Sequence, residues 1–276
     1  MFIFILINVK ILYMMKNYLL LSCVLLFSCS TESPESPREL TMGEKMAKME
    51  SCDIENICTT IEPEMSRNQT GRVSYKGLYW KPGQTIKIKF IDGVSYQHDR
   101  VKKYASEWTK YANLKFEWVE PNAYAEIKIS FKGKGNWSLV GINSEDTRQN
   151  EPSMNFSNLS KNYNEEEGGE VILHEFGHAL GLEHELQHPL KSFQWDIPFV
   201  YYYYDYRYKW NKEKVDLNVI NKFSINEVDY DAFDKESIMM YSIPSGLILD
   251  YISFSRTYKL SQGDKKSIAK IYPKTN

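Results

Sequence analysis

Hydrophobic and polar positions alternate in three short runs in the first half of the chain. Ile86, Ile88 and Phe90 are separated by lysines, and the same period of two recurs at 116–118 and at 127–131. A period of two places successive side chains on opposite faces, so each run predicts a half-buried strand.

A helical period replaces this alternation in several other stretches. Between the first two strands, five apolar residues recur at helical spacing: Val101, Tyr104, Ala105, Trp108 and Tyr111. They predict an amphipathic helix that packs on a sheet. A second helix is predicted to open near Gly169, after the acidic run at 165–167, and a last one after Ser261 as its N-cap. The stretch 133–150, rich in Asn, Ser and Gly, predicts a loop.

The first 29 residues predict export. From Met15 a short basic start leads into an apolar run that ends in Leu-Phe-Ser-Cys at 26–29. This run is too short for a spanning helix and has the form of a secretory signal peptide, with translation starting at Met14 or Met15. Its last four residues resemble a bacterial lipobox. We expect a lipid anchor on Cys29 at the bacterial outer membrane or cell surface, or secretion after conventional cleavage.

The remaining chain divides into a polar tether, 30–72, and one domain, 73–276. The tether carries Pro34 and Pro37 and a helical-looking stretch at 42–49, and it could double as a pro-segment. The second part has the usual size of a single domain.

Composition and charge narrow the function. Of 276 residues, 42% are hydrophobic and 25% are charged, which is typical of a folded chain. The net charge is −2 with no basic block, so no nucleic-acid partner is expected. Of four cysteines, two fall in the signal region, and only Cys52 and Cys58 remain. In an oxidising compartment a local disulfide between them is the default.

The chemistry is carried by a helix that includes His174, Glu175 and His178. Positions four apart share one helical face, so the two imidazoles can bind one metal ion. Glu175 lies about 100° around the axis, where it can act as general base on a water held by that ion.

The residues that follow add a third ligand. Gly181 can end the helix in a left-handed conformation and let the chain bring His184 to the same ion. Three imidazoles with one open position are typical of a catalytic zinc site. This spacing of residues arises by chance in roughly one chain in 10⁵. A merely buried helix would gain nothing from so many imidazoles and carboxylates.

The combined pattern resembles the metzincin zinc peptidases, and Glu185 directly after His184 is similar to their astacin branch. A second block, Ser-Ile-Met-Met-Tyr at 237–241, matches the Ser-x-Met-x-Tyr turn of that branch. The resemblance implies that Met239 forms an apolar floor under the imidazoles. It also implies that Tyr241 is an additional zinc ligand that helps to hold the developing oxyanion.

The resemblance extends over about Tyr79 to Pro273. Three further segments are similar to bacterial astacin-like domains: 80–83, 136–141 and 260–273. It implies an α+β fold with an N-terminal twisted mixed sheet, an active-site helix and a largely helical or irregular C-terminal subdomain. The implied function is a monomeric zinc-dependent endopeptidase with one Zn²⁺ per chain, acting on proteins or peptides. An edge strand within 153–159 is expected to pair with the extended substrate.

Several alternatives stay open at this stage. The pro-segment motif Phe-x-Gly-Asp of astacins is absent, and Cys52 or Cys58 could instead cap the zinc as a thiolate. Astacins bury their mature N-terminus against the glutamate that matches Glu185, and Arg67 and Arg72 are candidate cleavage positions here.

A different class of function is a non-cleaving surface binding or adhesion lipoprotein on the same scaffold. The retention of Glu175 and Tyr241 speaks against it. His188 precedes Pro189 outside the helix and is expected to be a loop residue rather than a fourth ligand. The tyrosine run at 201–204 is expected to pack in the C-terminal half.

Overall fold

The structure is a computed structural model. It describes residues 40–50, 77–157, 159–162, 164–226, 228–229, 231–240, 242–250 and 252–274. The predicted signal peptide with Cys29, the pair Cys52 and Cys58, and Tyr241 lie outside the described residues. The predictions for these residues therefore stay predictions.

Five strands form one mixed sheet. The strands are β1 (Thr85–Phe90), β2 (Lys115–Trp118), β3 (Ile127–Ser130), β4 (Asn136–Ser138) and β5 (Met154–Phe156). Their order across the sheet is β2-β1-β3-β5-β4, and only β4 runs antiparallel to its neighbour. The three predicted strands and the α+β class are confirmed.

Two expectations about this sheet were wrong. The stretch 133–150 contains β4 and a 3-10 helix, η2 (Gly141–Asp146), rather than only a loop. The segment expected to be the edge strand, 153–159, holds β5, which lies between β3 and β4. The edge strand on that side of the sheet is β4, whose three residues, Asn-Trp-Ser, are too few to show a period of two.

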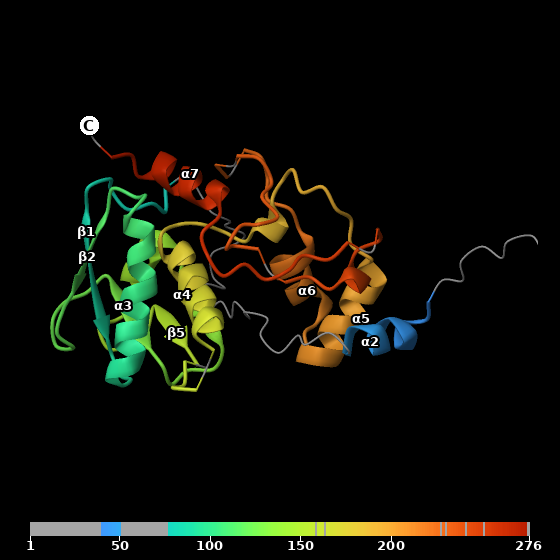
Figure 1. Cartoon of the computed structure of the whole chain (residues 1–276), viewed down its shortest axis with the longest axis horizontal. Helices are drawn as coiled ribbons and strands as arrows, with labels where there is room; N and C mark the ends of the chain where they lie inside the picture. The colour runs from blue at the N-terminus through green and yellow to red at the C-terminus, as the bar shows by residue number, and fades with distance from the viewer. Residues whose placement is uncertain are drawn as a thin grey trace, which may run out of the picture. The chain divides into compact units, whose positions relative to one another are not determined.

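One face of the sheet packs against two helices, α3 (Ser95–Thr109) and α4 (Glu165–Ala179). The isoleucines of β1 and β3 on this face are fully buried: Ile86, Ile88, Ile127 and Ile129. Trp108 of α3 and Phe176 of α4 complete the same hydrophobic cluster. Figure 1 shows α3 in green and α4 in yellow side by side, as their packing requires.

Two lysines on the opposite face, Lys89 and Lys128, are buried as well. Lys89 Nζ donates to the carbonyl of Ala123 at 2.9 Å, and Lys128 Nζ donates to the carbonyl of Ser144 in η2 at 2.6 Å. Burial, with Lys89 as a second cause, lowers the pKa of Lys128 to about 8. These two lysine side chains therefore bind the backbone of neighbouring segments instead of facing water.

Helix α4 begins four residues earlier than the sequence predicted. The side chain of Asn164 caps it by accepting from the backbone N–H groups of Glu166 at 2.8 Å and Glu167 at 3.3 Å. The acidic run therefore forms the first helical turn, where negative charge is favourable. Gly169 lies inside the helix rather than at its start.

The second half is helical and irregular, as expected. It contains η3 (Glu185–Gln187), α5 (Ile197–Tyr208), α6 (Lys212–Val215), the π-helical turn η4 (Asp216–Ile220), η5 (Ser245–Leu247) and α7 (Gln262–Ile271). Ser261 caps α7 by accepting from the N–H of Asp264 at 2.9 Å. Tyr203 and Tyr204 are buried in a second hydrophobic cluster and Tyr201 packs against it, as expected, whereas Tyr202 is exposed.

Helix α2 (Met42–Glu50) docks on this second cluster. Met46 is buried within it, and Lys45 forms an ion pair with Asp196, the residue that caps α5. Figure 1 shows α2 in blue beside α5 in orange. Part of the predicted tether is thus packed against the C-terminal half. Within the described residues, no helix combines the length and apolarity that crossing a membrane requires.

Candidate metal centre

Helix α4 places two imidazoles on one face. His174 and His178 are one turn apart and are 4% and 1% exposed. Their Nε2 atoms lie 3.1 Å from each other. The local sequence thus produces the paired arrangement that the spacing predicted.

Gly181 ends α4 and turns the chain back. Its φ of +92° lies in the left-handed region, where a side chain would be strained. Two hydrogen bonds close the helix end, from Leu182 N to Gly177 O at 2.9 Å and from Gly181 N to His178 O at 2.8 Å. The returning chain brings His184 Nε2 to 3.0 Å from His178 Nε2.

Backbone carbonyls fix the orientation of two rings. His174 Nδ1 is 2.8 Å from the carbonyl oxygen of Ile238, and His178 Nδ1 is 2.8 Å from that of Leu182. A carbonyl oxygen only accepts, so each Nδ1 carries the proton and donates. In a neutral ring the lone pair is then on Nε2.

The three rings are neutral at physiological pH. Burial lowers the pKa of His174 to about 4 and, with His174 as a further cause, that of His178 to about 3. Burial also holds the pKa of His184 well below its usual value. The nitrogen atoms of all three lie within 4.8 Å of one another, and no other group of three potential ligands occurs in the described part of the chain.

This donor set fits a zinc ion. Converging lone pairs repel each other, and a shared cation removes that repulsion. Tetrahedral zinc with Zn–N bonds of about 2.0–2.1 Å separates its nitrogens by about 3.3 Å. Two of the three separations, 3.0 and 3.1 Å from His178 to its neighbours, are close to this value, and all three ligand nitrogens lie within 4.8 Å of one another.

The methionine turn lies against the same helix. Met239 is 2% exposed, and a Cβ added at Gly177 would overlap its Sδ atom. The N–H of Glu185 donates to the carbonyl of Met239 at 3.1 Å, which ties the turn to the residue after His184. Met239 thus packs against α4 at Gly177, between the two helical histidines, and its role as an apolar floor under the imidazoles stays a prediction. The proposed ligand Tyr241 falls outside the described residues.

Two glutamates flank the ligands. Glu175 follows His174 on α4 and is fully buried. Glu185 accepts a hydrogen bond from the N–H of Asp234 at 2.7 Å. Burial raises the pKa of Glu185 to about 7, against the effect of that hydrogen bond. Glu175 is therefore shielded from water, whereas Glu185 is only partly shielded.

His188 does not join the three histidines. Its Nδ1 accepts from the N–H of Leu190 at 3.0 Å, and its ring lies edge-on to Phe233. It is a loop residue, as expected. Sequence reasoning gave Asp264 no role at the centre, although its hydrogen bonds reach the methionine turn. The Ser-x-x-Asp pattern at 261–264 indicates only a helix cap, and no local signal points to contacts 26 and 27 residues away.

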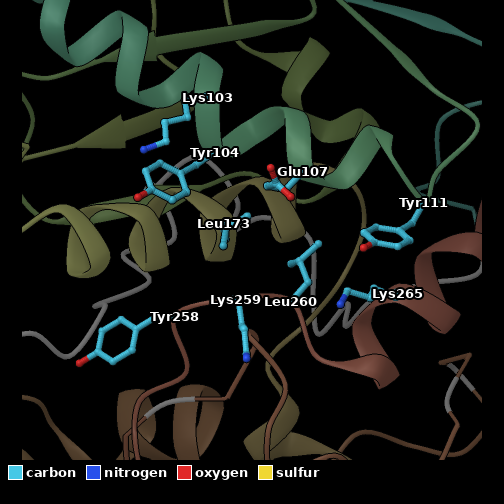
Figure 2. A pocket seen from close by; sticks show the side chains of 9 residues that line it. All are labelled: Lys103, Tyr104, Glu107, Tyr111, Leu173, Tyr258, Lys259, Leu260 and Lys265. Carbon is cyan, nitrogen blue, oxygen red and sulfur yellow. The ribbon is translucent and has the colours of Figure 1, made fainter.

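Two cavities lie near the centre. One of about 870 Å³ borders His184, Glu185 and Met239, and carboxylates dominate the charge of its wall. A smaller one of about 200 Å³ lies between α3, α4 and α7. Figure 2 shows its lining residues: Lys103, Tyr104, Glu107, Tyr111, Leu173, Tyr258, Lys259, Leu260 and Lys265. None of the three histidines lines the smaller cavity.

Comparison with solved structures gives the following matches. A structure of myroilysin is 37% identical in sequence to this chain and superposes with a TM-score of 0.71. The match covers 73% of this chain and 98% of the myroilysin chain. A second myroilysin structure gives 37% identity and a TM-score of 0.56, with 74% and 90% covered. High choriolytic enzyme 1, a hatching enzyme zinc-protease from the medaka fish Oryzias latipes, gives 15% identity and a TM-score of 0.48, with 71% and 94% covered. No family model and no curated protein matches the chain.

Proposed function

This chain belongs to the astacin-like metzincin zinc peptidases, and from that premise we propose that it is a zinc endopeptidase that hydrolyses peptide bonds of proteins. The observation that carries the proposal is the convergence of three neutral imidazoles, two of them fixed by backbone carbonyls with Nε2 toward one point. His174, His178 and His184 would hold the ion.

Bound zinc would act as a Lewis acid that lowers the pKa of a water molecule and polarises the peptide carbonyl. The chain supplies the proton transfers. Glu175 would accept the proton of the attacking water and then donate it to the leaving amine. Its complete burial keeps bulk water away from that carboxylate. By family resemblance Tyr241 would be an additional zinc ligand and would also stabilise the oxyanion.

The substrate would add a strand to the sheet at β4 rather than at β5. Leu139 N donates to Ser153 O at 2.9 Å, and Trp137 is the partner of Asn155 in the antiparallel register. In an antiparallel pair the backbone N–H and C=O groups of successive residues point alternately toward the partner strand and away from it. Those of Trp137 and Leu139 point toward β5, so those of Ser138 point away from it. Those groups would bind an extended peptide.

The cellular setting is part of the proposal. We propose a monomer with one zinc ion per chain, exported and anchored to the bacterial outer membrane or cell surface through lipid on Cys29, or secreted. The membrane would be reached only through that lipid. Cys52 and Cys58 would form a local disulfide or supply a thiolate that keeps the enzyme latent.

The test uses the purified full-length chain and a casein or quenched-peptide assay. We expect hydrolysis that 1,10-phenanthroline abolishes and added zinc restores. Glu175→Gln should lower kcat by about 10²–10⁴-fold, because it removes the general base. Glu166→Gln is the matched control, since it makes the same chemical change at the exposed far end of α4. Zinc content, measured by metal analysis, should be unchanged in both variants.

The outcomes separate the two functions. A zinc-loaded protein that cuts nothing, even with Cys52 and Cys58 replaced by serine, would favour the surface binding lipoprotein. Activity that first appears in that cysteine variant means a latent enzyme. Hydrolysis that survives Glu175→Gln would show that the proton passes through another group.

A further inference from the structure

A continuous line of hydrogen bonds leads from His174 to the carboxylate of Asp264. His174 Nδ1 donates to the carbonyl of Ile238 at 2.8 Å. The N–H of Met239 belongs to the same peptide group as that carbonyl, and it donates to Ser237 Oγ at 3.0 Å. The Ser237 hydroxyl in turn donates to Asp264 Oδ1 at 2.6 Å.

The second oxygen of Asp264 holds the turn in place. Asp264 Oδ2 accepts from the N–H of Ile238 at 2.8 Å and from the N–H of Ser261 at 2.8 Å. Asp264, Ser237 and Ile238 are each at most 5% exposed, so water does not compete for these bonds. One carboxylate from α7 therefore fixes both ends of the peptide segment that carries the His174 acceptor.

All three bonds in the line point the same way. The peptide group accepts from His174 and donates to Ser237, and the Ser237 hydroxyl accepts from the peptide group and donates to Asp264. Hydrogen bonds in such a chain polarise one another. Negative charge on the carboxylate thus increases the electron density on the Ile238 carbonyl oxygen. A stronger acceptor there makes the His174 ring a better metal donor and fixes its tautomer, as carboxylate partners do for metal-bound histidines.

We propose that Asp264 is a positioning residue for the metal ligand His174, acting through Ser237 and the peptide group between Ile238 and Met239. This inference rests on the proposed zinc site. It explains the serine of the Ser-x-Met-x-Tyr turn, because the Ser237 hydroxyl connects the carboxylate of Asp264 to the peptide group by hydrogen bonds. It also joins the final helix to the metal centre.

A simpler role for Asp264 is to cap α7, because its side chain and that of Ser261 exchange hydrogen bonds with each other's backbone. The matched pair Ser237→Ala and Ser261→Ala separates the two roles. Each variant removes one serine hydroxyl bonded to Asp264, but only Ser237→Ala breaks the line to His174.

The experiment measures the dissociation constant of Zn²⁺ by chelator competition on the full-length chain. We expect Ser237→Ala to weaken zinc binding by about 10–100-fold, the usual effect of removing an outer partner of a metal ligand. Ser261→Ala should keep the affinity of the unchanged protein, although both variants lose thermal stability in the zinc-free state. The absorption spectrum of the Co²⁺-substituted protein should shift in Ser237→Ala and stay the same in Ser261→Ala.

Asp264→Asn tests the charge, since it keeps the size and the planar shape of the side chain. We expect weaker zinc binding than in the unchanged protein. Equal zinc affinity in Ser237→Ala and Ser261→Ala would overturn the inference, as would full affinity in Asp264→Asn. If Asp264→Asn does not fold, the serine pair decides alone. A chain that binds no zinc in any form would instead refute the proposed function.

Discussion

Replacement of Gly177 by alanine should reveal how tightly the methionine turn is packed under the zinc helix. Gly177 lies on α4 between the two helical histidines. An added Cβ would overlap Met239 Sδ and would lie 3.3 Å from Met239 Cε and 3.2 Å from Trp108 Cζ2. Met239 and Trp108 are both buried, so neither can swing into water. The added methyl group must displace Met239.

Two opposing terms set the size of the effect. Alanine in place of glycine inside a helix stabilises it by about 1 kcal/mol. Forcing a methyl group into a filled core costs about 1–3 kcal/mol. We therefore expect Gly177→Ala to lower the free energy of unfolding by about 1 kcal/mol. In a Met239→Ala background the overlap is gone, and the same change should raise that energy by up to about 1 kcal/mol.

A double-mutant cycle measures this reversal directly. Urea unfolding with excess chelator keeps metal binding out of the free energy. The expected coupling energy between the two sites is about 2 kcal/mol, within the usual range for residues in contact. If Gly177→Ala has the same effect in both backgrounds, then Met239 does not pack against α4 as the structure shows, and the reasoning fails.

Two further predictions concern the sheet. Ser138→Pro removes the outward N–H of β4 and should raise KM for long peptides without changing KM for short ones, whereas Ser138→Ala should leave both unchanged; an unaltered KM in the proline variant would exclude strand addition at β4. Because the pKa of Lys128 falls from 10.5 to about 8 on folding, the unfolded chain binds more protons between pH 8 and 10.5, and stability should rise with pH there. The free energy of unfolding of the unchanged protein, measured in urea relative to that of Lys128→Met, should therefore increase by at most about 3 kcal/mol over this pH range. If the difference between the two proteins does not change with pH, the prediction is wrong.

Much of the fold could be predicted because its elements carry their own local patterns. Ile86, Ile88 and Phe90 alternate along one strand, and the apolar positions of α3 recur at helical spacing. The cap of α7 is also local, since Ser261 and Asp264 are three residues apart. Each of these signals needs only a window of a few residues.

The missed elements have weak local signals or depend on distant residues. The strand β4 has three residues and is defined by its pairing with β5, whose partner residues lie 16 to 20 positions further along the chain. The two glycines at 168 and 169 look like helix breakers, but Asn164 and the acidic turn start α4 before them. The docking of α2 includes an ion pair between Lys45 and Asp196, which are 151 residues apart.

The candidate site shows the same division between local and distant causes. The positions of the three histidines follow from a helix face and one left-handed glycine, all within eleven residues. The orientation of their rings depends partly on a distant segment, because the Ile238 carbonyl that fixes His174 lies 64 residues away in the sequence. A buried helix with the same spacing but without such acceptors could present Nδ1 or a protonated ring instead. The carbonyl partners of His174 and His178 therefore distinguish a metal centre from a coincidence of spacing more sharply than the spacing itself does.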